Sequence, residues 1–509
     1  MNKKNLLYIF LLFFLIRDGV AQVTFVKNYS NGNFNERQPL VQTLDGGYAY
    51  TNNSQDGSYI NKVSADGNLN WSKIYPFRAW MLTSLIQIPN GHFVGGGIIE
   101  DTTQVFEHNF YLFETDSSGN PIWAKSYGDP LIVEQPMSMQ LTNDGGYILA
   151  GGIGSLCLIV KTNSVGDTLW TRVYSDSIEG LDCHFIEQTF DNCYILSGRK
   201  GRGCYIMKID SVGQILWIKS FSNDYFGTYG NFPYEIHQTN DSGFILGGMR
   251  DTIQGGDVEI FLIRTDQYGD TLWTRILNSP ERDVLYSVIQ TPDEGFAFTG
   301  YAYINQGQVS YIGKLDLNGD TLWMKSNSIY QWSEGYSISS TTDGGYLCTG
   351  SCGMFGGVVD VFLIKTDSSA NSGCNQGHVS FNVSTLQTTI STPTIYSAAT
   401  SNIEVQTINV QSLNYNILDS TICSSVSINE IGNKIFLAVS PNPASSTFTI
   451  DGGDVQNLKL EIYNLLGLKV YETKYMEPLT LNFELFPKGI YLVRLQSEKA
   501  SAVLKLIIH

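Results

Sequence analysis

The stretch Arg264–Trp273 reads RTDQYGDTLW, and Lys314–Trp323 repeats it as KLDLNGDTLW. Each copy begins with a basic residue, has an acid two places on and a glycine five places on, and ends in tryptophan. Six copies end at Trp71, Trp123, Trp170, Trp217, Trp273 and Trp323. Nine residues before these tryptophans lie Lys62, Glu114, Lys161, Lys208, Arg264 and Lys314. A polar turn between two apolar runs predicts a β-hairpin.

A second repeated turn precedes each of these hairpins. It is an Asp or Asn, usually followed by glycine and then by an apolar run, and it recurs every 45 to 54 residues. The acids or amides are Asp45, Asn90, Asp144, Asp191, Asp241, Asp293 and Asp343. Each repeat therefore holds four short strands, which is the period of a propeller blade. The sequence predicts an all-β protein in which residues 22–373 form a seven-bladed β-propeller.

The last repeat lacks its fourth strand. In KTDSSANSGC (Lys365–Cys374), Ala370 replaces the glycine and Cys374 replaces the tryptophan. The missing strand has a counterpart near the N-terminus, where residues 23–29 read VTFVKNY, with the aromatic–x–basic–x–aromatic form of Trp71–Tyr75. We therefore predict that this N-terminal strand completes the seventh blade and closes the ring.

The recurrent tryptophans are interpreted as core residues between neighbouring blades. The basic residues near them either lie on the indole face as cation–π partners, with the turn acid balancing the charge, or are solvated together with that acid. The sequence leaves both alternatives open.

The composition limits the possible partners. The 509 residues carry a formal charge of −17, which disfavours nucleic acid and anionic membranes. Lys3 and Lys4, the apolar run Leu6–Ile16 and the small residues Gly19–Ala21 predict a secretory signal peptide over residues 1–21. No later segment is apolar enough over its length to predict a transmembrane helix.

The eight cysteines contain no CxxC pair, so no structural zinc site is predicted. Cys157 and Cys204 occupy equivalent places in neighbouring repeats and are expected in the core. Cys374 and Cys423 lie outside the repeats and are candidates for a disulfide, because export permits such bonds. They bracket most of residues 374–436, a Ser/Thr-rich segment interpreted as a spacer or as extended strands.

Variable loops on one face of the propeller are the predicted place for recognition. Aromatic side chains there would stack on sugar rings or a peptide, or would only cover the blade tops. They are Trp80, Tyr225, Tyr229 and Trp332. Acids before the innermost strands would ring the channel mouth and hold a cation, or would be solvated. They are Glu36, Glu134, Asp182, Asp283 and Glu334.

Catalytic motifs are not evident in the sequence. It contains no HxxxH, GxSxG or P-loop pattern, and no cofactor or metal is predicted. The predicted function is binding or adhesion, with glycans or surface proteins as partners. Two alternatives remain open: a polysaccharide-active hydrolase with a spatially assembled carboxylate pair, and a purely structural surface protein.

The C-terminal residues 437–509 predict a small β-sandwich, because alternating apolar runs are separated by turn residues. SPNPASSTFTI (440–450), EIYNLLG (461–467), GIYLV (489–493) and KLII (505–508) occur in this order. The region resembles the C-terminal sorting domain of the type IX secretion system of Bacteroidota. The resemblance rests on Pro441, Asn442, Pro443, Gly489, Tyr491 and Lys505.

This resemblance implies Sec export followed by translocation across the outer membrane, with the type IX machinery as a partner and a secreted or surface-attached product. The polar turns also resemble the Asp-box of sialidase-like propellers, with a longer spacing to the tryptophan. The Asp-box is a folding element, and it implies no activity.

Overall fold

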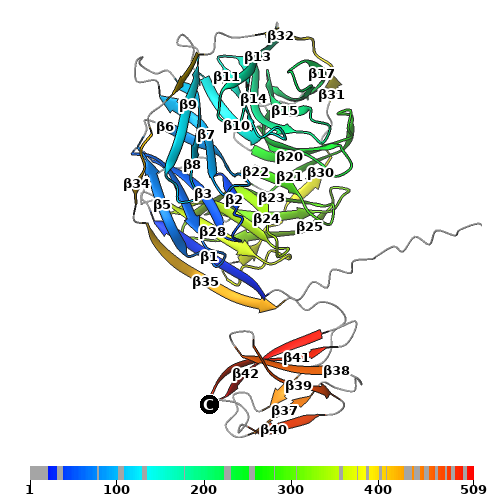
Figure 1. Ribbon diagram of the computed structural model, residues 1–509. Helices are drawn as coiled ribbons and strands as arrows, with labels where there is room; N and C mark the ends of the chain where they lie inside the picture. Colours follow the sequence, from blue (N-terminus) through cyan, green and yellow to red (C-terminus); the bar gives the residue numbers. More distant parts are fainter. Residues whose placement is uncertain are drawn as a thin grey trace, which may run out of the picture. The chain divides into compact units, whose positions relative to one another are not determined.

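The computed structural model describes residues 21–508 except for 31–37, 101–107, 129–133, 223–230, 252–257, 429–437, 441–446, 452–457, 483–487, 497–500 and gaps of one to four residues elsewhere. The described residues form strands and turns, without a helix. They divide into two compact units, Val23–Ser425 and a second unit that includes Val426–His509. Figure 1 shows the strands of both units.

Each repeat in the first unit folds into an antiparallel sheet whose strands follow in chain order. The first strands are β2 (Leu40–Gln42), β6 (Ala79–Gln87), β10 (Glu134–Leu141), β14 (Leu181–Gln188), β18 (Asn231–Gln238), β22 (Asp283–Gln290) and β26 (Trp332–Ser340). The second strands are β3 (Tyr48–Ser54), β7 (Phe93–Glu100), β11 (Tyr147–Ile153), β15 (Tyr194–Lys200), β19 (Phe244–Asp251), β23 (Phe296–Ile304) and β27 (Tyr346–Gly353).

The outer strands continue the same order. The third strands are β4 (Gly57–Val63), β8 (His108–Thr115), β12 (Leu156–Thr162), β16 (Gly203–Ile209), β20 (Val258–Thr265), β24 (Gly307–Leu315) and β28 (Val359–Thr366). The fourth strands are β5 (Leu69–Tyr75), β9 (Pro121–Gly128), β13 (Thr168–Asp176), β17 (Ile215–Ser222), β21 (Thr271–Asn278), β25 (Thr321–Asn327) and, for the last repeat, β1 (Ala21–Ser30).

The two repeated motifs meet within each sheet. In the third repeat the Asp144 carboxylate accepts hydrogen bonds from the backbone N–H of Gly146 at 2.9 Å and from the Thr142 hydroxyl at 2.5 Å. Gly145 has φ of +79°, which glycine adopts without strain. The buried Lys161 amine lies 2.9 Å from the same carboxylate. The base of one motif is therefore the ion-pair partner of the acid of the other, and it is neither solvated nor an indole partner.

This ion pair recurs in the other repeats, with one inversion. The equivalent pairs are Lys62–Asp45, Lys208–Asp191, Arg264–Asp241, Lys314–Asp293 and Lys365–Asp343. In the second repeat Asn90 replaces the acid and Glu114 replaces the base, and the Glu114 carboxylate lies 2.6 Å from Nδ1 of His92. In this repeat the side chain on the third strand is therefore acidic, and its partner in the turn is the imidazole of His92.

The tryptophans lie at the boundaries between sheets, as the sequence predicts. The Trp273 ring lies 5.7 Å from the Phe296 ring of the next repeat at an interplanar angle of 71°. The equivalent ring pairs are Trp71–Phe93, Trp123–Tyr147, Trp170–Tyr194, Trp217–Phe244 and Trp323–Tyr346. A cation–π contact involves the basic residue two places after the tryptophan, with Arg275 lying 5.4 Å from the Trp273 ring centre.

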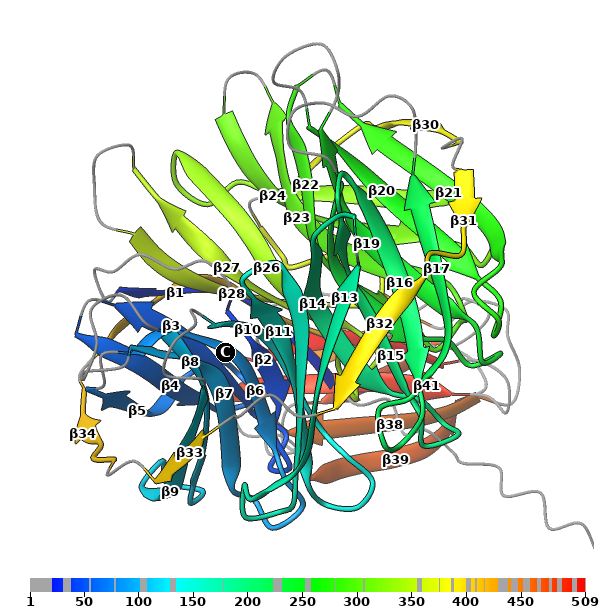
Figure 2. The ribbon, with the colours of Figure 1, turned by 90° about the horizontal axis from the view of Figure 1, so that it is seen from above.

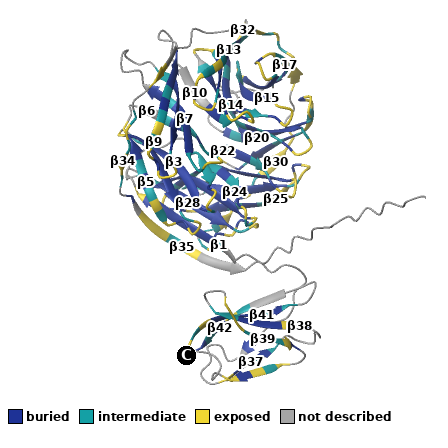
Figure 3. Ribbon diagram, viewed as in Figure 1, coloured by how far each residue is buried: buried dark blue, intermediate teal, exposed yellow. Residues whose placement is uncertain are grey.

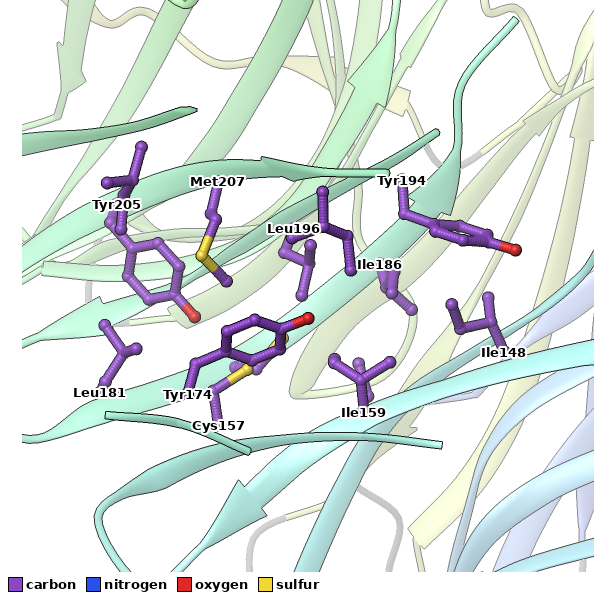
Figure 4. Packing of buried hydrophobic residues seen from close by; sticks show 14 residues of the cluster. Ile148, Cys157, Ile159, Tyr174, Leu181, Ile186, Tyr194, Leu196, Tyr205 and Met207 are labelled. Atoms are coloured by element: carbon purple, nitrogen blue, oxygen red, sulfur yellow. The ribbon is translucent and has the colours of Figure 1, made fainter. Parts of the chain in front are cut away.

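The core of the first unit lies between neighbouring sheets. Figure 4 shows one boundary, at which Ile148 and Ile159 of the third repeat face Leu196 and Met207 of the fourth. Buried residues extend along most of these strands (Figure 3). Because both faces of such a sheet are apolar, a single repeat cannot bury its surface, and neighbouring repeats bury it for each other.

The N-terminal strand β1 takes the fourth place in the last sheet. It pairs antiparallel with β28, with Phe25 opposite Lys365 and Tyr29 opposite Val361. The buried Phe25 and Tyr29 also pack with Tyr48 of the first repeat. Each first strand contacts the first strand of the next repeat, and β26 contacts β2. The last sheet and the first sheet are therefore neighbours in the fold.

Residues 376–428 contain extended strands, which was one of the two alternatives for this segment. They are β29 (Gln376–His378), β30 (Asn382–Ser384), β31 (Thr389–Ser391), β32 (Ile395–Ala399), β33 (Glu404–Thr407), β34 (Leu413–Asn414) and β35 (Leu418–Ile428). We call these strands the belt. Each belt strand adds a fifth strand to a sheet: β29 joins β25, β30 joins β21, β31 joins β17, β32 joins β13, β33 joins β9, β34 joins β5 and β35 joins β1. Figure 2 shows the belt in yellow and orange along the outer strands.

A disulfide joins Cys374 to Cys423, at the two ends of the belt. Cys157 and Cys204 are buried free thiols, as expected of core residues. Cys348 and Cys352 are also buried and free. The remaining free thiols are Cys183, which is buried, and Cys193, which is partly exposed.

The second unit contains two sheets. One has the order β36 (Ala438–Ser440), β37 (Thr447–Asp451), β40 (Leu479–Asn482), and the other has the order β39 (Lys469–Tyr475), β38 (Leu458–Asn464), β41 (Gly489–Gln496), β42 (Ser501–Ile508). Side chains from both sheets form one core that includes Phe448, Ile462, Val493 and Leu506. The alternation read from the sequence places these residues on the inner faces.

Candidate functional site

A cavity of about 220 Å³ lies between the first strands of the first unit. Its lining includes residues of β2, β6, β10, β14, β18, β22 and β26. Every repeat therefore contributes to one shared hollow, and the side chains at its wall determine what it can hold.

The first strands carry a β-bulge at an equivalent position. In β22 the pairing with β23 passes from Leu285 to Ser287 and leaves Tyr286 without a cross-strand partner. The same shift leaves out Thr83, Met137, His184, Tyr234 and Tyr336 in their strands. A bulge aims the extra residue away from the regular ladder. The side chains of Thr83, His184, Tyr234, Tyr286 and Tyr336 all line the cavity.

Gln38 holds this position in the first repeat. Like the bulge residues, it lies seven residues before the turn acid, here Asp45, and it lines the cavity. Its side chain is buried, and its amide nitrogen donates a 2.8 Å hydrogen bond to the Ser351 hydroxyl. Its carbonyl oxygen Oε1 has no hydrogen-bond partner among the described residues. This oxygen is itself buried, so a ligand would reach it only after a shift of the Gln38 side chain.

A glycine on the second strand makes room for the bulge in five of the repeats. A Cβ on Gly300 would lie 1.8 Å from the Val284 carbonyl oxygen, and one on Gly198 would lie 1.8 Å from that of Asp182. Gly97, Gly248 and Gly350 meet equivalent carbonyl oxygens at 1.8–2.2 Å. This explains the glycine that ends the apolar run after the turn. The first repeat has Asn52 instead, and β2 spans only three described residues.

We call Gln38, Thr83, Met137, His184, Tyr234, Tyr286 and Tyr336 the ring positions. The six bulge residues share one backbone place, Gln38 matches them in its distance from the turn acid, and the side chains differ. Tyrosines occupy three successive repeats, and polar side chains occupy the first, second and fourth. The cavity therefore has one aromatic side and one hydrogen-bonding side.

The tyrosines form a packed cluster. The Tyr286 ring lies 5.0 Å from the Tyr234 ring and 5.0 Å from the Tyr336 ring. The Tyr336 hydroxyl donates a 2.7 Å hydrogen bond to the Glu334 carboxylate. Burial, followed by the charge of Glu334, raises the pKa of Tyr286 well above its usual value. The Tyr286 phenol therefore stays neutral, and the three packed rings serve as aromatic surface.

His237 carries a second group of charges beside the cavity. Its Nδ1 lies 2.5 Å from the Glu187 carboxylate and its Nε2 lies 3.4 Å from the Glu235 carboxylate. Burial lowers the pKa of His237, but the two carboxylates outweigh it and raise the pKa to about 10. The two acids also accept hydrogen bonds from the backbone N–H groups of Gln238 and Val288. These charges are committed to contacts within the protein.

The aromatic residues predicted from the loops are not brought together in the described structure. Trp332 begins β26, where it pairs with Gly353 and contacts Gln308 of the preceding sheet, and it does not line the cavity. Trp80 lies in β6, and only its backbone is described. Tyr225 and Tyr229 lie outside the described residues.

The acids proposed to ring the channel mouth have separate partners. Asp283 is buried and accepts a 2.8 Å hydrogen bond from the Ser279 hydroxyl. Asp182 pairs with Arg199 at 3.0 Å, and Glu334 accepts from Tyr336. These three side chains are therefore not simply solvated. Glu36 and the side chain of Glu134 lie outside the described structure. In the described part of the chain no three His, Cys, Asp or Glu side chains gather to hold a metal.

The ring positions were not among the residues predicted from the sequence. A signal was present, because each ring position lies seven residues before the turn Asp or Asn. Residue type does not mark these positions, since a bulge inside a strand leaves no composition bias.

The C-terminal unit carries some of the residues that suggested a sorting signal. Gly489 opposes Ile508 across β41 and β42, and Lys505 opposes Leu492. Tyr491 is buried in the core, whereas Lys505 is exposed. Pro441, Asn442 and Pro443 lie outside the described residues.

Comparison with known families identifies this unit. Residues 438–509 match the family described as the secretion system C-terminal sorting domain. The chain is thus a cargo protein of type IX secretion, directed to the outer cell surface or the extracellular space, and this domain contacts the secretion machinery. The described part of the chain has no helix that is long and apolar enough to cross a membrane.

Other comparisons add little. No curated protein matched the sequence. A solved structure of PorZ, described as an essential bacterial surface component of the type-IX secretion system of Porphyromonas gingivalis, is 9% identical, with 91% of this chain and 73% of that chain covered and a TM-score of 0.34. A structure described as the eukaryotic initiation factor is 10% identical, with 90% and 98% covered and a TM-score of 0.29. Scores this low support no argument about fold or function.

Proposed function

We propose that this protein is a surface or secreted binding protein built on a seven-bladed β-propeller, and that its central cavity holds a single sugar ring of a glycan. The repeated four-strand sheets, the contacts between successive first strands and the pairing of β1 with β28 support the propeller. The sorting domain supplies the export route.

One observation carries the binding proposal: equivalent bulges present different side chains to one cavity. A fixed backbone with variable side chains suits recognition. Sugar rings offer an apolar C–H face and a rim of hydroxyls, which correspond to the tyrosine side and the polar side of the cavity. After a shift of its side chain, the Gln38 carbonyl, which has no hydrogen-bond partner among the described residues, would accept from one such hydroxyl.

A glycan array with the full mature chain tests the proposal. We expect specific binding that Thr83→Trp abolishes, because the indole fills the cavity. Gln38→Ala should weaken binding about tenfold, through loss of one buried hydrogen bond. The matched control is Tyr268→Ala, which removes an exposed aromatic ring outside the cavity and should leave binding unchanged.

Other outcomes separate the alternatives. Release of free sugars from the bound glycan would favour a hydrolase. The absence of glycan binding, or binding that Thr83→Trp leaves intact, would contradict the proposed site and favour a structural role or a protein partner.

A further inference from the structure

The belt visits the sheets in the reverse of their chain order. It leaves the last repeat at Cys374, pairs next with β25 of the sixth repeat, and then with β21, β17, β13, β9 and β5 in turn. It finally reaches β1 in the last sheet through β35. The described belt therefore passes along the outer edges of all the repeat sheets and returns to the sheet from which it started.

Belt side chains also enter the cores between sheets. Val379 is part of the core between the fifth and sixth repeats, and Ile417 is part of the core between the last and first. Tyr415 lies edge-on to Tyr59 with ring centres 4.9 Å apart. The belt is therefore attached both by backbone pairing and by apolar burial, and it covers strand edges that would otherwise be open.

The strand β1 is the fourth strand that the belt covers in the last sheet. It lies between β28 and β35 in the sheet, and in sequence it is followed by the first repeat. Every other fourth strand is joined to its own third strand by a short turn, whereas β1 and β28 are separated by most of the chain. Only non-covalent contacts hold β1 in place on its β28 side.

The disulfide lies at this same junction. Cys374 follows the final turn of the last repeat and Cys423 lies within β35, the strand that covers β1. Both cysteines pack against a core that includes Val26 of β1. One bond therefore ties the chain that leaves the last repeat to the strand that holds the N-terminal strand in place.

We propose that the Cys374–Cys423 bond converts the belt into a closed hoop that locks β1 into the last sheet, so that reduction of this bond alone opens the ring at β1. Two electrons and two protons from a dithiol such as dithiothreitol convert the bond into two thiols, and the dithiol becomes a disulfide. Without the bond, β35 can separate from β1 while the other sheets stay formed.

Native-state hydrogen exchange of the full mature chain tests this proposal. We compare the oxidised protein with the same protein treated with dithiothreitol, and loss of the bond is verified by thiol alkylation and mass. Exchange in β1 and β35 should rise by about tenfold or more after reduction, and exchange in β14 and β18 should not change.

The double variant Cys374→Ser/Cys423→Ser should reproduce the reduced pattern without a reductant. Cys193→Ser is the matched control, because it removes a partly exposed free thiol and should behave as the oxidised protein does. Equal protection of β1 with and without the bond would overturn the proposal. An equal rise throughout the first unit would also overturn it, because the bond would then support the whole fold and not this junction.

Discussion

The Phe25 ring of β1 lies 6.5 Å from the Tyr48 ring of β3, across the boundary between the last and first repeats. In the other repeats a tryptophan makes this contact, as Trp273 does with Phe296. The Tyr29 hydroxyl donates a 2.5 Å hydrogen bond to the Gly67 carbonyl, as the Tyr75 hydroxyl does to Gly119 at 2.8 Å. The N-terminal strand thus reproduces both contacts of a regular fourth strand.

Replacing Phe25 by alanine should lower the free energy of unfolding by about 3 kcal/mol, because the buried ring leaves a cavity between two sheets. Urea unfolding of the full mature chain measures the effect. Phe190→Ala is the control: this side chain is 66% exposed, and its loss should change stability by less than about 0.5 kcal/mol. Deletion of residues 22–30 should cost more still, and an unchanged melting temperature would contradict ring closure by β1.

The substitution Gly300→Ala should destabilise the protein by about 1–3 kcal/mol, because the new methyl group would meet the Val284 carbonyl oxygen at 1.8 Å. Gly152→Ala is a matched control in another second strand, where the nearest atom is 3.9 Å away. Thermal unfolding compares the two variants. Equal melting temperatures would show that the bulges tolerate a Cβ and that the glycine has another role.

The inverted pair in the second repeat predicts a rescue experiment. Glu114→Lys should destabilise the protein, because a buried lysine would face His92 without an acid. The triple variant Asn90→Asp/His92→Gly/Glu114→Lys installs the arrangement of the other repeats and should recover most of the loss. Chemical unfolding of both variants checks the prediction, which fails if the triple variant is no more stable than the single one.

Lowering the pH should reduce the stability of the first unit, because its turn aspartates become protonated. Burial alone would raise the pKa of Asp144, but hydrogen bonds from Thr142, Lys161 and Gly146 outweigh it and lower the pKa to about 2. The folded state therefore binds fewer protons than the unfolded state between about pH 4 and pH 2, and the stabilisation is lost as the pH falls through this range. Asp144→Asn should flatten the pH dependence there, as equilibrium unfolding would show, and an unchanged slope would contradict it.

Removal of the sorting domain should block the last step of export. A chain that ends before residue 437 is expected to remain in the periplasm, because residues 438–509 carry the match to the sorting family. Cell fractionation followed by surface proteolysis measures the location. The variant Cys193→Ser, which retains the domain, should be exported normally. Surface delivery of the truncated chain would refute the assignment.

Local patterns predicted much of the fold. The turn Asp and Gly residues mark hairpins whose hydrogen bonds involve neighbours in sequence, as between Asp144 and Gly146. The match between residues 23–29 and the tryptophan strands predicted the pairing of β1 with β28 because the same contacts recur six times elsewhere.

The belt and the ring positions could not be predicted in this way. Belt strands such as β34, with two residues, are too short to show an alternation, and their partners lie far away in sequence. The bulges depend on contacts between a carbonyl and a glycine on separate strands. The sequence showed that a basic residue recurs at the position of Lys161 in most repeats, but it did not show that the partner of Lys161 is Asp144, because that acid belongs to the other repeated turn.

The direction of the belt has a consequence for how this protein folds. The repeats follow the chain once, and the belt then travels back, so that each belt strand pairs with residues farther away in sequence than the strand before it. Contacts of large sequence separation form slowly. If docking starts at β29, the smallest loop closes first. Each later strand then has a shorter free segment of chain between it and its partner. We therefore expect the belt strands to dock in chain order, with β35 and Cys423 docking last.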